Sequence, residues 1–459
     1  MSANGARARR RRARARGVPP WTLPLAARRA MGKAVRDRLP RKELGRWEVD
    51  ARRADLVPRL LAAVSGRRAD LLPIRWEKMA ASPFGFLRGT AALMAGDVGP
   101  MARTGLDVQV CGDAHLLNLG AYGAPDGRLV FDLNDFDETC RGPFEWDLKR
   151  LAASFTVAGR VAGKSGPSCA SAVHALAAAF VDGLARYSEL AVLDLARLEL
   201  GPRRAGKPLA PIFTEARRNT PTELLARATR PAAGGYARFR SEPPLLVPLA
   251  TGMRRRVFRA LAPYRATLGP GRQQLLDAYP PHDAAFKVVG TGSVGLEVYL
   301  VLLYGNGPRD PLFIQVKEQD PTCWRPYLRG GPYRRLHPHD GRRAAEGQLR
   351  TQTMGDPFIG WTELGGKDFL VRQWSDHKAS VNVGLLASGA FPDYADLCGE
   401  VLAKAHARTG DAGALSGYCG RGGALGDALA AFAAAYADQV EADYARFTKA
   451  LKRGELQTR

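Results

Sequence analysis

The sequence predicts an α+β fold with a large helical lobe and a small lobe built on an antiparallel sheet. Two observations carry this prediction. Alanine-rich stretches at 146–184 and 424–452 repeat apolar residues at helical spacing, which predicts long helices. From Phe286 to Lys317 the pattern changes to short apolar runs with alternation, separated by glycine-rich turns, which predicts antiparallel strands.

The composition is that of a globular protein that can bury a large core. The chain has 459 residues, and 46% of them are hydrophobic. It has no run of eighteen or more uncharged apolar residues and no apolar secretory signal, so we expect a cytoplasmic location and no membrane span. The six cysteines are scattered without a CxxC pair, which argues against a structural zinc site and a disulfide framework.

The N-terminal residues are strongly basic. Seven arginines lie between Arg7 and Arg16, and the whole chain carries a net charge of +23. The segment has no apolar periodicity, so we expect a disordered basic tail. Such a tail is expected to make at most weak contacts with nucleic acid or with a membrane surface.

The rest of the chain divides by pattern. Leu56, Leu60 and Val64 recur at helical spacing, whereas 201–248 is rich in Pro, Arg and Thr and predicts a variable loop or a small insertion. The predicted parts are a tail and linker at 1–45, the first part of the large lobe at 46–282, the small lobe at 283–380, and C-terminal helices that complete the large lobe at 381–459.

The stretch from Val110 to Glu138 carries the clearest chemistry. Asp113 and Asn118 stand in the order D-x-x-x-x-N, in which phosphoryl-transfer enzymes supply a carboxylate for the attacking hydroxyl and an amide oxygen for Mg²⁺. Asp135 follows a strand-like run of residues. Because Mg²⁺ prefers carboxylate and phosphate oxygens, we expect Asn118 and Asp135 to hold it, with Asp137 either a second metal ligand or a surface acid.

A glycine-rich turn is the main feature of the small lobe. Gly290, Gly292 and Gly295 form G-x-G-x-x-G between two predicted strands. Missing side chains let backbone N–H groups approach the phosphates of a nucleotide, so we predict phosphate contacts from these glycines and from Ser293. A plain hairpin turn is the alternative. A dinucleotide-binding turn is disfavoured, because a strand rather than a helix follows the glycines.

A lysine and a glutamate complete the predicted nucleotide site. Lys317 ends the third strand of the small lobe and is expected to contact the α and β phosphates. Glu346 lies in a later helical stretch and is expected to hold Lys317 as an ion pair. A solvated helix charge is the alternative for Glu346.

Two short motifs resemble a known group of enzymes. GDAHLLN and FDLNDFD are similar to signatures of the aminoglycoside phosphotransferases, which have the protein-kinase-like fold. The resemblance implies that His115 braces the catalytic loop and that Asp147 is a structural acid. Arg88 precedes the loop and is expected to face the acceptor or the phosphates, with a salt bridge inside the large lobe as the alternative.

Longer motifs recur along most of the chain. They are SPFGFLRG at 82–89, CGDAHLLNLG at 111–120, NDFDET at 134–139, GPFEWDLKRLAAS at 142–154, VGTGSVG at 289–295, VRQWSDHK at 371–378, AHARTGD at 405–411 and YADQVEADY at 436–444. These motifs resemble those of the uncharacterised bacterial family called domain of unknown function 2252. By this resemblance Arg372, Asp376 and Lys378 would line the cleft.

The order of the motifs predicts a circularly permuted version of the two-lobed, protein-kinase-like fold. In ordinary kinases the glycine turn and its lysine precede the catalytic loop, whereas Gly290 follows Asp113 here. Alternatively, the hairpin is unrelated and the small lobe lies before residue 110. Permutation is favoured, because 45–110 contains no glycine-rich turn followed by a V-x-K strand.

Together these patterns predict an ATP- and Mg²⁺-dependent phosphotransferase that acts on a hydroxyl group. ATP and Mg²⁺ are the expected cofactors, and the acceptor is not encoded in any motif, because a fold does not determine its substrate. Three alternatives stay open: nucleotidyl transfer by the same fold, a metal-dependent phosphoesterase suggested by Gly-Asp-x-His, and a non-enzymatic nucleic-acid binder that uses the basic tail.

Overall fold

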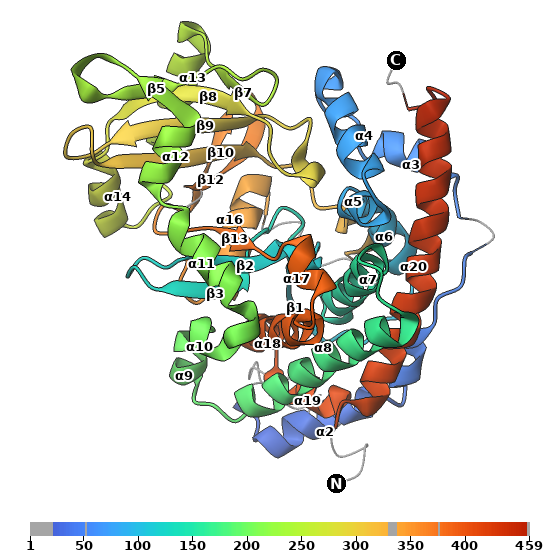
Figure 1. The fold of residues 1–459 in the computed structure, drawn as a ribbon. Helices are drawn as coiled ribbons and strands as arrows, with labels where there is room; N and C mark the ends of the chain where they lie inside the picture. The colour runs from blue at the N-terminus through green and yellow to red at the C-terminus, as the bar shows by residue number, and fades with distance from the viewer. Residues whose placement is uncertain (1–21, 51–52, 329–336, 375–376, 457–459) are drawn as a thin grey trace.

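The protein joins a six-stranded sheet to a larger body of helices (Figure 1). The computed structural model describes residues 22–50, 53–328, 337–374 and 377–456. The predicted α+β class is confirmed, because helices form most of the chain and every strand pair is antiparallel. The predicted basic tail lies outside the described residues.

The largest sheet belongs to the small lobe. Its order is β11 (Gly360–Leu364), β12 (Lys367–Gln373), β10 (Pro311–Glu318), β9 (Val298–Tyr304), β8 (Pro281–Lys287) and β7 (Leu246–Pro248). Lys317 of β10 is paired with Val298 on one side and Leu370 on the other, so it stands in the middle of the sheet. The sheet reaches back to β7, ahead of the predicted start of the small lobe at 283.

Both faces of this sheet are covered. In β9 every residue is buried, with Val301 in the apolar cluster on one face and Leu302 in the cluster on the other. Helix α13 (Thr251–Arg265) contributes to the first cluster and α12 (Pro221–Ala228) to the second. This explains why the strand reads as a continuous apolar run. Helix α16 (Asp340–Thr351) packs on β12 near the sheet edge.

The helical body combines the two halves of the sequence. Helices α7 (Glu145–Val161) and α8 (Gly166–Tyr187) pack against α18 (Phe391–Thr409) and α20 (Gly423–Lys452) (Figure 1). Helix α7 lies at the centre, because its residues from Glu145 to Gly159 are all buried. Residues before and after the small lobe therefore share one core.

Helix α8 is long and apolar enough, by length and composition, to cross a membrane. It is the one helix among the described residues that passes this test. More than half of its apolar window is buried inside the protein, mainly against α18, and a core helix passes the same test. The helix is therefore only weak evidence for a membrane span.

The interpretation of 1–45 as tail and linker is wrong for its second half. Helix α2 (Leu25–Val35) and a 3₁₀ turn (Arg41–Gly45) pack on the body, with α2 against α19 (Ala412–Cys419). Gly32 permits the contact, since a Cβ there would overlap a backbone carbonyl of α19. Arg36 donates hydrogen bonds to the carbonyls of Gly417 and Tyr418 at the end of α19. A basic side chain of this segment thus caps the C-terminus of another helix.

The region 201–248 is also more ordered than the predicted loop or insertion. It contains α10 (Pro202–Ala205), α11 (Ala210–Arg218), α12, a hairpin of β5 (Thr229–Pro231) and β6 (Ala237–Phe239), and β7. Within the described residues, the remaining α-helices are α3 (Leu56–Ala62), α4 (Leu72–Ala80), α5 (Pro83–Arg88), α6 (Ala91–Val98), α9 (Val192–Arg197), α14 (Pro270–Asp277) and α17 (Val383–Ala387).

Two short sheets present residues 110–138, the predicted catalytic segment. The strand β1 (Asp107–Val110) pairs with β4 (Cys140–Pro143). The strand β2 (Leu119–Gly123) pairs with β3 (Leu129–Leu133) and β13 (Ala379–Ser380). The loop that carries Asp113 therefore leaves the end of β1, and the loop that carries Asp135 leaves the end of β3, so both open toward the small lobe.

Candidate functional site

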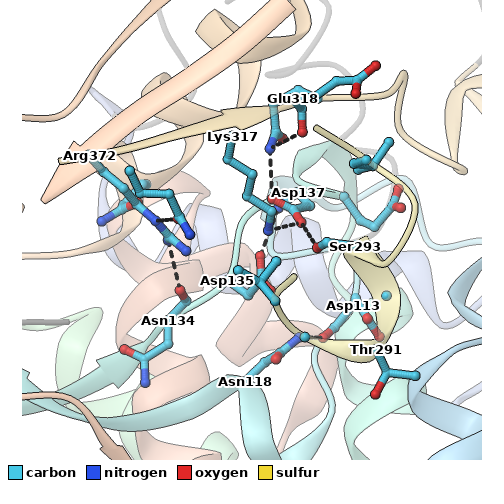
Figure 2. A pocket seen from close by; sticks show the side chains of 18 of the residues that line it. Asp113, Asn118, Asn134, Asp135, Asp137, Thr291, Ser293, Lys317, Glu318 and Arg372 are labelled. Atoms are coloured by element: carbon cyan, nitrogen blue, oxygen red, sulfur yellow. Dashed lines mark hydrogen bonds and ion pairs between the residues drawn. The ribbon is translucent and has the colours of Figure 1, made fainter. Parts of the chain in front are cut away.

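A cavity of about 940 Å³ lies between the sheet of the small lobe and the helical body. Its lining comes chiefly from four stretches, 62–92, 113–138, 289–320 and 348–378. Figure 2 shows the side chains from the catalytic segment and from β10 pointing toward one another. The structure therefore brings together residues that lie far apart in the sequence.

Asp147 of α7 holds the backbone just before Asp113. The Asp147 carboxylate accepts the backbone N–H groups of Cys111 and Gly112 at 2.8 and 2.9 Å. His406 of α18 lies with Nε2 3.2 Å from the same carboxylate. All of these contacts are buried, so Asp147 fixes the backbone that leads to Asp113, as expected for a structural acid.

Asp113 itself faces the cavity and is oriented by a buried arginine. Arg150 donates Nε to Asp113 Oδ1 at 2.8 Å. Asn118 donates its amide nitrogen to the Asp113 carbonyl at 2.8 Å, which leaves the amide oxygen of Asn118 for another partner. The residues that the D-x-x-x-x-N motif predicted to act together are therefore adjacent.

His115 is a buried neutral side chain beside this loop. Its Nδ1 accepts the Leu117 N–H at 3.2 Å, and burial lowers the pKa of His115 to about 3. A histidine that stays neutral and caps the next turn fits the expected brace. It also lines the cavity near Asp113.

Asp137 is the centre of a network that joins the two lobes. Its Oδ2 atom forms an ion pair with Lys317 and accepts the Ser293 hydroxyl at 3.0 Å, and its Oδ1 accepts the Gln319 amide at 2.9 Å (Figure 2). Burial alone would raise the pKa of Asp137, but the Lys317 ammonium and these hydrogen bonds hold it below its usual value. Asp137 is thus not a surface acid in this structure.

The predicted ion pair between Lys317 and Glu346 is not formed. Glu346 pairs with Arg342 at 2.7 Å and Arg350 at 2.8 Å along the exposed side of α16. The cause is helical phase: Ala344 and Gln348 face the protein interior, and a residue halfway between them points away. The partner of Lys317 is Asp137 instead.

Asp135 lies beside Asn118 at the cavity wall. Its carboxylate accepts the backbone N–H of Asp137 at 3.3 Å and forms no ion pair within the described part of the chain. The described residues also contain no group of three or more His, Cys, Asp or Glu side chains arranged around a metal position. A cation here would thus take one carboxylate oxygen from Asp135 and the amide oxygen of Asn118.

The glycine turn, residues 289–295, is held by basic side chains from the helices α3 to α4 region. Arg75 donates to the carbonyls of Thr291 and Gly292, both at 2.7 Å, and burial lowers the pKa of Arg75 to about 9. Arg67 donates to the Gly292 carbonyl at 2.6 Å. Lys78 donates to the Val289 carbonyl at 3.1 Å. Gly290, Gly292 and Ser293 therefore line the cavity from a fixed turn, whereas Gly295 belongs to the turn but is not one of the lining residues.

Several functional candidates were missed by sequence reasoning. Arg67, Arg75 and Lys78 belong to no motif. Arg75 and Lys78 lie on α4, where basic residues usually indicate a solvated face, and Arg67 lies in the loop before it. Arg150 and Gln319 were missed because their partners lie on distant segments.

The far end of the cavity is polar. Arg372 donates to Gln315 Oε1 at 3.0 Å and to the Asn134 carbonyl at 3.3 Å, and Lys378 lines the same wall. Asp356 accepts the backbone N–H groups of Phe358 and Gln373, and burial raises the pKa of Asp356 to about 6. Arg372 and Lys378 thus lie where the family resemblance predicted, whereas Asp376 lies outside the described residues.

The family model described as "Uncharacterized protein conserved in bacteria (DUF2252)" matches residues 67–450. The chain belongs to the DUF2252 family. In this DUF2252 protein the match takes in the glycine turn, its basic contacts and the whole catalytic segment. Searches of curated proteins and of solved structures find no match.

Proposed function

We propose that this protein is an ATP- and Mg²⁺-dependent phosphotransferase that acts on a hydroxyl-bearing acceptor. One observation carries the proposal: Asp137 of the catalytic segment is bonded to Ser293 of the glycine turn and to Lys317 of β10, which are 156 and 180 residues away in sequence. Phosphoryl transfer needs a proton acceptor, metal ligands and a phosphate-binding lysine around one cavity. All three kinds of side chain line this one.

The topology of the small lobe supports the same proposal. The chain runs from β8 through the glycine turn to β9 and β10, then through α16 to β11 and β12. Lys317 lies on β10, the third of these strands. This order is similar to the nucleotide-binding lobe of the protein-kinase-like fold. The helical body is completed by α18 to α20 after the small lobe. A circular permutation of a kinase-like fold accounts for both observations.

The cavity fits a nucleotide by size and by its unmet hydrogen-bonding capacity. Its volume of about 940 Å³ falls in the range of small-molecule sites. Four of the residues that line it have a buried polar atom with no hydrogen-bond partner within the described residues: Arg88 Nε, Asn134 Nδ2, Gln319 Oε1 and Gln348 Oε1. Buried polar groups are normally bonded, so these atoms indicate a ligand.

The residues divide the reaction between them. The acceptor hydroxyl oxygen forms a bond to the γ-phosphorus of ATP, the bond from that phosphorus to the ADP oxygen breaks, and Asp113 takes the hydroxyl proton. Arg150 holds Asp113 in the orientation for this step. Bound Mg²⁺, held by Asn118 and Asp135, would neutralise charge on the phosphates. Lys317, released from Asp137, would contact the α and β phosphates.

Isothermal titration with ATP, with and without Mg²⁺, tests the proposal. We expect Mg²⁺-dependent binding that weakens at least about tenfold in Asp135→Asn and in Lys317→Met, because each change removes a charge-assisted contact. Asp438→Asn and Lys164→Met make the same chemical changes on the surface and should bind like the wild type. If the wild type binds no nucleotide, the proposal fails, and the phosphoesterase and nucleic-acid alternatives move ahead.

Nucleotidyl transfer is the second candidate, and one observation favours it. The cavity wall from 62–92 carries Arg67, Arg75 and Arg88 but no acid, so positive charge is available beyond the glycine turn for phosphates held in the reverse orientation. The mass of the modified acceptor, or of the modified protein, separates a phosphoryl from an adenylyl addition.

A further inference from the structure

Arg88 differs from the other two arginines of its cavity wall. Arg67 and Arg75 use their guanidinium groups to hold the carbonyls of the glycine turn. No hydrogen bond or ion pair to the Arg88 guanidinium occurs within the described residues, although its Nε atom is buried. Arg88 as a whole is half-buried, but a guanidinium whose Nε is shielded from water without a partner costs free energy, so its place in a cavity calls for an anionic ligand.

The backbone on both sides of Arg88 is fixed by other arginines. Arg150, which orients Asp113, also donates to the Leu87 carbonyl at 2.7 Å. Arg75, which holds the glycine turn, also donates to the Gly89 carbonyl at 2.8 Å. Arg88 is therefore placed rigidly between the predicted proton acceptor and the predicted phosphate-binding turn.

The surroundings of Arg88 agree with this position. The backbone carbonyl oxygen of Arg88 would lie 3.9 Å from a Cβ placed on Gly292, so the end of α5 is next to the glycine turn. Burial lowers the pKa of Arg88, whereas the Asp113 and Asp135 carboxylates raise it, which places the guanidinium in the field of both acids. The group that passes from ATP to the acceptor must lie between these same acids and the turn.

We propose that Arg88 is a catalytic residue that binds the γ-phosphoryl group of ATP during transfer. This inference rests on the proposed phosphotransferase function. A planar guanidinium can donate two parallel hydrogen bonds to phosphate oxygens, and in a water-poor cavity it stabilises the charge on the transferring group. The residue comes from α5, outside both the glycine turn and the catalytic loop.

The test compares MgATP with MgADP, because only ATP carries the γ-phosphoryl group. In Arg88→Gln we expect the dissociation constant for MgATP to rise about tenfold or more, while that for MgADP changes less than about twofold. Arg88→Lys keeps the positive charge but loses the two parallel donors of the guanidinium, so its dissociation constant for MgATP should lie between those of the wild type and Arg88→Gln. Arg103→Gln, which removes an arginine outside the cavity, should change neither affinity.

Thermal unfolding separates this role from a structural one. Arg88 is half-buried and has no partner within the described residues, so Arg88→Gln should have an unfolding temperature equal to or above that of the wild type, whereas loss of a structural contact would lower it. If Arg88→Gln weakens MgATP and MgADP equally, or neither, the γ-phosphoryl role is overturned while nucleotide binding stands. If the wild type binds neither nucleotide, the phosphotransferase function falls first and this role with it.

Discussion

Asp147→Ala gives the sharpest test of how the loop at Asp113 is supported. The substitution leaves the backbone N–H groups of Cys111 and Gly112 buried without an acceptor, at about 1–3 kcal/mol each. His406, which is fully buried, loses its partner as well. We therefore expect a loss of about 3–5 kcal/mol in the free energy of unfolding. Asp147→Asn keeps one acceptor oxygen and should lose about half as much.

Urea unfolding, followed by circular dichroism and tryptophan fluorescence, measures this loss. The fluorescence is a local probe, because Trp324 donates its indole N–H to the Gly112 carbonyl at 2.7 Å. Asp438→Ala removes an exposed acid that pairs with Arg160 at the surface, and it should cost less than about 0.5 kcal/mol. An Asp147→Ala protein that unfolds at the same urea concentration as the wild type would refute the reasoning.

Four further outcomes can be checked with single variants. Lys404→Met should cost about 3–5 kcal/mol in urea unfolding, because it leaves Asp132 charged and buried, and adding Asp132→Leu should recover most of the loss. Burial raises the pKa of Asp356 to about 6, so the stability from its protonation is full below about pH 4 and lost as the pH rises through 6. Asp356→Asn should therefore flatten the fall of the unfolding temperature between about pH 4 and 7. Arg75→Met should speed hydrogen exchange in 289–295 and weaken MgATP binding about threefold to tenfold, since the glycine turn loses its main support. Glu346→Gln should leave MgATP affinity within about twofold of the wild type, because its ion pairs are on the surface; a larger loss would restore the lysine pair that the sequence predicted.

The strands of the small lobe were predictable because their signal is local. β9 and β10 are seven and eight residues long, apolar, and separated by a glycine-rich hairpin turn. β7 has three residues and contains a proline, so no alternation could reveal it. Helix α2 was missed for another reason: its stability comes from close contact with α19, 380 residues away, and its composition resembles that of the basic tail before it.

The candidate site divides in the same way. Asp113, Asn118 and Asp135 lie close together in the sequence, so their place in one cavity could be predicted from their spacing, and all three line it. The different roles of Arg75 and Arg88 were harder to predict from the sequence. Arg75 is bonded to the glycine turn, whereas Arg88 Nε has no partner within the described residues, and such partners lie on other segments of the chain. For Glu346 the helix was correctly expected, but the sequence did not fix which side of the helix would face the cavity.

The buried pairs of the catalytic segment have a consequence for synthesis of the chain. Asp132 and Asp147 leave the ribosome long before α18, which supplies their partners Lys404 and His406. Until α18 emerges, burying either carboxylate would leave it uncompensated, so the loops at the end of β1 and β3 cannot settle into their final form. A nascent chain halted before α18 would carry every motif of the cavity and still lack an ordered one. Under the proposed function, ribosome-bound intermediates should therefore acquire nucleotide binding only in the last stage of translation.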